Sequence, residues 1–72
     1  MKNLLYKALL SHYNAQKDEA IAIIETYLQK SVGIGEHSNI LDELKKWTAT
    51  LAEADEALQI LEKYFKEKGE FK

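Results

Sequence analysis

Apolar residues in the second half of the chain recur at alternating steps of four and three. The positions are Ile40, Leu44, Trp47, Leu51, Ala54, Leu58, Leu61 and Phe65. Such steps are the a and d positions of a heptad repeat, which line one side of an α-helix. The pattern predicts one long amphipathic helix, from about residue 39 to about residue 68.

The first half of the chain carries the same spacing with two polar interruptions. The positions are Tyr6, Leu10, Tyr13, Lys17, Ala20, Ile24, Tyr27 and Ser31. They predict a first helix from about residue 2 to about residue 32. We expect the stem of Lys17 to lie along the apolar groove and its ammonium to reach out to Asp55. Whether Lys17 fixes the register or is simply a partly exposed lysine stays open.

The two heptad patterns match when the chain is folded back between Gly35 and Glu36. Every seam position then meets a seam position in antiparallel order. The predicted pairs are Tyr6–Phe65, Leu10–Leu61, Tyr13–Leu58, Lys17–Ala54, Ala20–Leu51, Ile24–Trp47, Tyr27–Leu44 and Ser31–Ile40. We therefore predict an all-α fold with one domain over residues 1–72, an antiparallel two-helix hairpin resembling a coiled coil.

The flanks of the seam support this register. It places Lys7 near Glu62 and Lys30 near Glu43. These are pairs of opposite charge, and each contributes about 0.5 kcal/mol when exposed. Their value lies in the agreement between local and long-range patterns, which is typical of sequences that specify one fold.

The segment between the predicted helices is interpreted as a structural turn. Its residues are Gly33, Ile34, Gly35, Glu36 and His37. Gly33 suits the left-handed position that ends a helix, and Ser38 or Asn39 suits the N-cap of the next one. Anion binding by the backbone amides is the weaker alternative, because nucleotide-binding loops need a preceding strand and more glycines. A metal site with His12 is disfavoured, since that side chain is about 30 Å away along the helix.

The turn carries a resemblance to a known group of proteins. The stretch VGIGEHS at residues 32–38, followed by LQILEKYF at residues 58–65, resembles short uncharacterised helical proteins of tailed bacteriophages, especially myoviruses of marine cyanobacteria. The resemblance implies a phage origin and a site of action inside an infected bacterium. It implies no activity, and no functional residue is transferred from it.

Charge and amino-acid usage narrow the class of protein. The net charge is −2, and all 10 basic residues are lysine. An acidic chain without arginine is a poor nucleic-acid binder. The N-terminal apolar run is interrupted by Lys7 and His12, so it is too short and too polar for a signal peptide or a membrane span. We expect a soluble, cytoplasmic protein with no nucleic-acid and no membrane partner.

The residue types needed for catalysis or cofactor binding are sparse. The chain has no cysteine and two histidines. The acidic residues of the run EADE at residues 53–56 face outward from the seam, and no Glu-x-x-His spacing of the di-iron bundles occurs. No nucleophile is paired with a base. We therefore expect no enzyme, no cofactor and no metal site.

Several large apolar residues remain outside the seam. One flank carries Leu5, Leu9, Ile23, Ala57, Ile60 and Tyr64, and the other carries Ile21, Leu28 and Leu41. A 72-residue hairpin buries little apolar surface, so self-association is the expected source of further stability. The candidate interface of a homodimer, forming a four-helix bundle, is Leu5, Leu9, Ile60 and Tyr64.

The expected function is a protein-interaction module that binds a host or phage protein. Two alternatives stay open. One is a structural or chaperone-like accessory of phage assembly, and the other is a sensor that binds an anion or small ligand at the GIGEH loop.

The turn hypothesis makes a quantitative prediction. Gly33→Ala is expected to lower the free energy of unfolding by about 1 kcal/mol, because alanine is strained in the left-handed conformation. His37→Ala is the control and is expected to change it much less. Urea denaturation of both variants measures the difference. A larger loss for the histidine variant would reject the structural turn.

Overall fold

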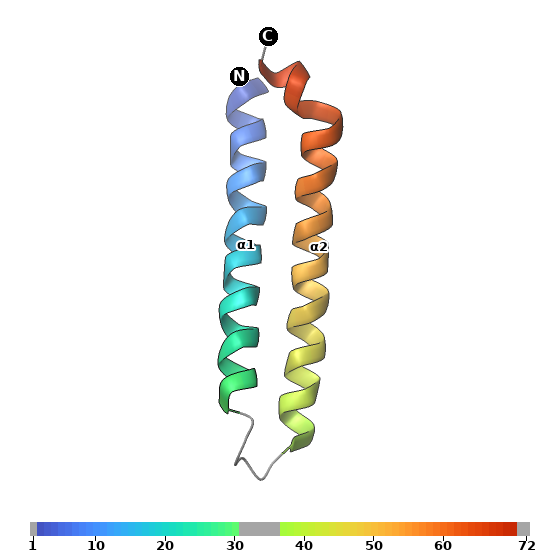
Figure 1. Cartoon of the computed structure of the whole chain (residues 1–72). Coiled ribbons are helices and arrows are strands. Elements are labelled where there is room, and N and C mark those ends of the chain that lie inside the picture. The colour runs from blue at the N-terminus through green and yellow to red at the C-terminus, as the bar shows by residue number, and fades with distance from the viewer. Residues whose placement is uncertain (1, 31–36, 71–72) are drawn as a thin grey trace.

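The computed structural model describes the backbone of residues 2–30 and 37–70 and the side chains of residues 4–30 and 39–66. Within these residues the chain forms two α-helices, α1 (Lys2–Lys30) and α2 (His37–Glu70). The helices run antiparallel, and both termini lie at the same end of the molecule (Figure 1). The rod measures 54 × 15 × 14 Å. The predicted all-helical hairpin is confirmed.

The start of α2 differs from the prediction. His37, expected in the turn, is the first residue of α2, and the helix continues to Glu70. Ser38 and Asn39 therefore have helical backbone, and neither is the N-cap. The first four backbone N–H groups of an α-helix have no acceptor within the helix. The first turn therefore does not depend on seam contacts, and the helix can begin one or two residues before its first seam residue. Gly33, Ile34, Gly35 and Glu36 lie outside the described residues, and their role as a turn stays a prediction.

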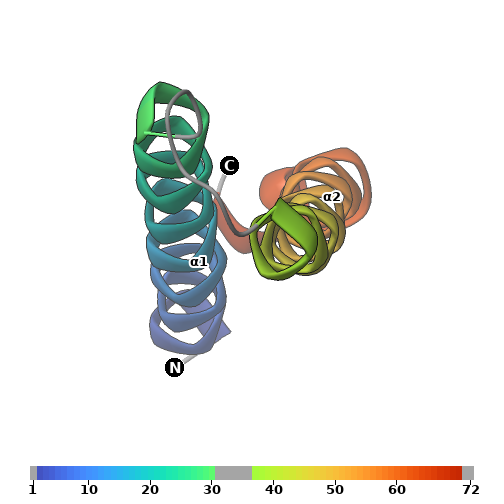
Figure 2. The ribbon, with the colours of Figure 1, turned by 90° about the horizontal axis from the view of Figure 1, so that it is seen from below.

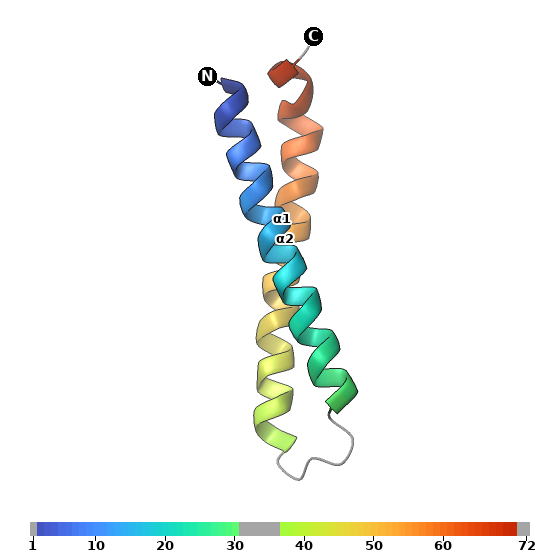
Figure 3. The same cartoon turned by 90° about the vertical axis from the view of Figure 1, so that its left-hand side faces the viewer.

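The predicted seam is the contact between the helices. The most deeply buried of the described residues are Ala20 and Ala54, each with 0% of its surface exposed, followed by Leu61. The helices cross at an angle rather than lying parallel (Figures 2 and 3). Alanine side chains let crossing helices approach closely, because little more than a methyl group separates the backbones.

A third row of residues on each helix is drawn toward the contact. Counting the seam as a and d, five of the eight described g positions are half-buried: Gln16, Ile23, Glu43, Thr50 and Ala57. The other three, Leu9, Lys30 and Tyr64, are exposed. Every e position is exposed: Lys7, Asn14, Ile21, Leu28, Leu41, Thr48, Asp55 and Glu62. The hairpin thus has two different sides, which we call the g face and the e face.

The polar contacts differ from the predicted ion pairs. Among the described residues, no ion pair joins Lys7 to Glu62 or Lys30 to Glu43. Glu62 instead lies 3.5 Å from Lys66 on its own helix. Lys7 and Glu62 are exposed at e positions, so Glu62 gains as much from Lys66 one turn away as from the other helix. Lys30 and Glu43, at g positions, lie near each other as expected and line one groove, but without an ion pair.

Lys17 lies in the seam as expected, but without the predicted partner. Its side chain is half-buried and lines a shallow groove of the e face together with Asp55. No ion pair joins the two among the described residues. The carboxylate of Asp55 accepts a hydrogen bond from Gln59 Nε2 at 3.0 Å.

The tight contact at the alanines makes a prediction about packing. Ala54→Leu is expected to lower the free energy of unfolding by about 1–3 kcal/mol, because the added side chain has no space between the helices. Ala49→Leu is the matched control, since Ala49 is exposed on the outer side of the same helix. Thermal and urea unfolding, followed by circular dichroism, compare the two. Equal stability of the two variants would show that the helices do not meet closely at Ala54.

Candidate interaction surface

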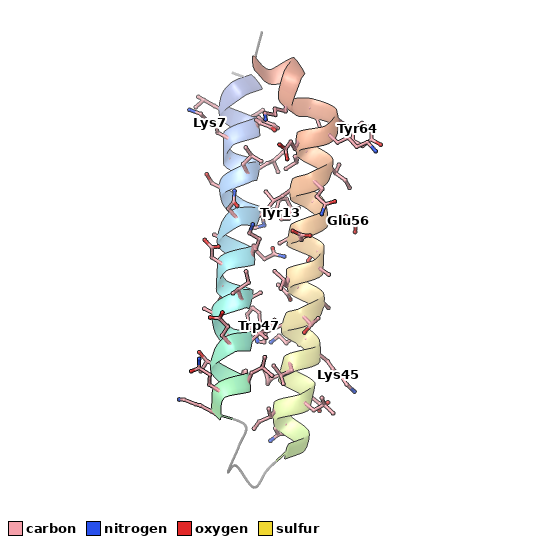
Figure 4. All side chains as sticks on the ribbon, viewed as in Figure 1. Lys7, Tyr13, Lys45, Trp47, Glu56 and Tyr64 are labelled. Carbon is pink, nitrogen blue, oxygen red and sulfur yellow. The ribbon has the colours of Figure 1, made fainter. Side chains whose placement is uncertain are left out.

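Four large apolar side chains lie exposed on the g face at the open end of the hairpin. Leu5, Leu9, Ile60 and Tyr64 expose 71%, 43%, 44% and 54% of their surface. Leu5 and Leu9 are one turn apart on α1, and Ile60 and Tyr64 are one turn apart on α2. We call these four residues the end patch. Tyr64 points away from α1 into solvent (Figure 4). All four side chains are exposed, as expected from the sequence, and their role as an interface stays a prediction.

Two further apolar side chains lie near the end patch. Phe65, expected in the seam opposite Tyr6, is 49% exposed, and its ring centroid lies 6.3 Å from that of Tyr64. The hydroxyl of Tyr6 donates instead to the carbonyl oxygen of Leu61, 3.5 Å away and one turn before Phe65. Leu4 is 66% exposed and was not singled out from the sequence. The adjacent pair Leu4–Leu5, both of them outside the seam, is the signal that could have identified it.

A polar bridge joins the helices at the middle of the g face. The amide Nε2 of Gln16 lies 3.1 Å from the carbonyl oxygen of Thr50 and 3.2 Å from Oε1 of Glu53. Both contacts run from α1 to α2, and an amide nitrogen has two protons to donate. The heptad pattern gave no indication of this bridge, because Gln16 lies outside the a and d positions.

An apolar groove opens on the same face near the connection between the helices. It has a volume of about 640 Å³. Its lining consists of Ile23, Thr26, Tyr27, Lys30, Asn39, Ile40, Glu43 and Trp47, and we call it the loop-end groove. All eight residues occupy c, d or g positions, so the groove belongs to the g face. From the sequence, Tyr27, Ile40 and Trp47 were expected only as seam residues, yet each is half-buried here.

Trp47 is held in place at this groove by its neighbours. Its indole nitrogen donates to Oε1 of Glu43 at 3.3 Å, and the ammonium of Lys46 lies 5.3 Å from its ring. In Figure 4 the side chains of Trp47 and Tyr13 lie between the two helices. Contacts on both the polar and the aromatic part of the ring restrict its rotation.

The other predicted surface residues fall into two groups. Ile23 and Ala57, expected on the flank, are half-buried in the hairpin. Ile21, Leu28 and Leu41 are exposed along the e face, as expected. These three lie on the half of that face nearer the connection between the helices, whereas Lys7, Asn14, Asp55 and Glu62 lie on the half nearer the open end, so the e face carries a second, smaller apolar strip.

Sites for other chemistry are less evident in the described part of the chain. It contains no group of three or more His, Asp or Glu side chains arranged to hold a metal ion. No helix within it is long and apolar enough to cross a membrane. Of the five predicted turn residues only His37 is included, at the start of α2. The geometry thus draws attention to the g face.

Comparison with known proteins adds no relative. No protein family, no curated protein and no solved structure matches this chain. Its function is therefore argued from its own residues.

The polar bridge can be tested by removing its donor. Gln16→Ala is expected to lower the free energy of unfolding by about 0.5–1.5 kcal/mol, through loss of both contacts to α2. Gln59→Ala is the matched control, because the amide of Gln59 bonds only within its own helix, to Asp55. Urea unfolding of the two variants measures the difference. A loss no greater for Gln16 than for Gln59 would show that the bridge does not stabilise the hairpin.

Proposed function

We propose that this chain is a small, non-enzymatic protein-interaction module that acts through its g face and forms a homodimer. The observation that carries the proposal is the end patch. A two-helix hairpin without a partner is expected to place charged side chains at c positions, yet this one places Leu5 and Ile60 there. A continuous exposed apolar area on a small protein marks a contact surface.

The energetics favour association. Full burial of one large apolar side chain contributes roughly 1.5–3 kcal/mol. A twofold axis beside the g face would bury the end patch of both copies at once. Even a fraction of that energy sustains a dissociation constant in the micromolar range, which corresponds to about 8 kcal/mol. The resulting assembly is a four-helix bundle.

The cellular role rests on the resemblance at residues 32–38. It supports a phage-encoded accessory protein that acts in the cytoplasm of an infected bacterium and binds a host or phage protein. Affinity capture of the tagged chain from infected cells tests this role. Enrichment of one host or phage regulatory protein supports the interaction module, whereas enrichment of capsid or tail proteins would replace it with an accessory role in assembly.

Dimerisation through the end patch is tested by a charge at its centre. Ile60→Glu is expected to weaken the dimer at least tenfold, because about 1.4 kcal/mol is lost when a carboxylate is forced into an apolar contact. Ala49→Glu is the matched control, since it adds the same charge on the outer side of α2. Sedimentation of the three proteins at tens of micromolar measures the association. A wild-type chain that sediments as a stable 8.3 kDa monomer would refute the dimer.

A further inference from the structure

The e face changes in character along the rod. Its half nearer the connection between the helices carries the exposed apolar strip of Ile21, Leu28 and Leu41. Its half nearer the open end is polar, with Lys7 and Asn14 at the e positions of α1 and Asp55 and Glu62 at those of α2. In that half the e row of α1 is therefore positive, and the e row of α2 is negative.

The b positions flank the e positions on the outer side of each helix, and beside the strip they carry charges of the opposite order. Glu25 on α1 and Lys45 on α2 are exposed there at nearly the same height along the rod. Among the described residues, neither of them belongs to an ion pair. The e face thus has opposite charges on its two helices both at the open end and beside the strip.

We infer that the e face binds the e face of a second copy, with the connecting loops of both copies at the same end. The twofold axis then runs along the rod. It places α1 antiparallel to α2 of the second copy, and α2 antiparallel to α1 of the second copy, so the two contacts are identical. This contact lies on a different face from the proposed g-face homodimer and does not depend on it.

The two e rows are complementary in this orientation. Residues of the two copies meet at nearly equal heights along the rod, because the axis is parallel to it. The pairs, with the second residue taken from the second copy, are Lys7–Glu62, Asn14–Asp55, Ile21–Thr48 and Leu28–Leu41. The flanking b positions agree, since Glu25 meets Lys45 and Asp18 meets Ala52. Charges meet opposite charges, and the most exposed apolar residues of the strip meet each other.

Lys17 gains a defined place in this arrangement. Its half-buried side chain lines a groove of about 440 Å³ on the e face, together with Asp55 but without an ion pair to it. The second copy covers this groove and brings Lys17 and Asp55 of both copies around the axis in alternating order. Each lysine then lies between two aspartates, and its own counterpart is diagonally opposite. Two positive and two negative charges balance there, as a contact that removes charges from water requires.

The opposite orientation, with the loops at opposite ends, fits less well. It sets α1 against its own counterpart and α2 against its own counterpart. With the rods fully overlapped, Lys7 meets Leu28 of the second copy and Glu62 meets Leu41, so charges are placed on apolar residues. With only the apolar strips overlapped, Glu25 meets its own counterpart, and the like charges repel each other. The order of charges therefore favours loops at the same end.

The e-face contact depends on charge as well as on apolar area. Its strip has three large apolar side chains in each copy, whereas the end patch has four. We expect the e-face contact to be weaker than the g-face homodimer and to weaken further as salt rises, because salt screens exposed charges. Copies joined through their g faces keep their e faces open, so this contact carries assembly beyond two copies.

Disulfide trapping tests the contact and its orientation, because the natural chain contains no cysteine. A mixture of Ile21→Cys and Thr48→Cys chains is expected to give mainly the mixed disulfide under mild oxidation, and less of it at high salt. Ala22→Cys replaces Ile21→Cys in the control mixture, since Ala22 is exposed on the outer side of α1. This control is expected to remain largely unlinked. Circular dichroism of each variant before oxidation verifies that it is folded.

Repeating the trapping in chains that also carry Ile60→Glu separates the two faces, because this substitution disrupts only the g-face contact. Mixed disulfides between Ile21→Cys and Thr48→Cys in both backgrounds support the e-face contact. Linkage no better than the Ala22→Cys control would refute it and leave the g-face homodimer untouched. Stronger linkage of Ile21→Cys to Leu28→Cys than to Thr48→Cys would overturn the orientation, since those two residues meet only when the loops lie at opposite ends.

Discussion

The contact at Ala20 and Ala54 is the constraint on which the rest of the hairpin depends. Both side chains are fully buried, whereas none of the large side chains described is. Small residues at the crossing let the backbones approach, and the aromatic side chains of Tyr13 and Trp47 lie between the helices beside it. The helices cross at an angle, so they do not keep one spacing along their length. The apolar groove opens near the connected end of the pair.

The g positions are more buried than the e positions, and the cost of removing charged side chains from water explains the difference. The e rows carry Lys7, Asp55 and Glu62, whose charges would be costly to bury without partners. The g rows hold Ala57, Ile23 and Thr50, which lose little on partial burial. They also hold Gln16, which finds acceptors on α2, and Glu43, whose carboxylate accepts a hydrogen bond from the indole of Trp47. Burying the g positions therefore leaves fewer polar and charged side chains without a hydrogen-bond partner than burying the e positions would. The greater burial of the g positions makes the two faces of the hairpin different.

Much of the fold was predictable from the heptad pattern. The spacing from Ile40 to Phe65 and its weaker counterpart from Tyr6 predicted both helices and the buried seam. The end patch was predictable as well, because Leu5 and Ile60 are apolar at positions that a lone hairpin leaves in water. These features depend on which side of a helix a residue occupies, and that information is present in the residue order alone.

The features that were not predictable depend on side-chain geometry. The polar bridge needs the reach of Gln16 across the contact, and no periodicity encodes that reach. The predicted pairs of Lys7 with Glu62 and Lys30 with Glu43 competed with partners on the same helix, and charge order cannot decide between them. Phe65 lies in the last turns of the seam, near the open end, so the pattern marked it as buried although half of it is exposed. The loop-end groove arises from three-dimensional packing around Trp47.

The thinness of the core links folding to association. Among the described residues only Ala20, Ala54 and Leu61 are buried, and two of these contribute little apolar area. A hairpin with so small a core has little stability in reserve. Covering the g face would convert half-buried residues such as Ile23 and Trp47 into core residues. A partner that binds only the folded form stabilises it by mass action, so the stability of such a hairpin rises with its own concentration.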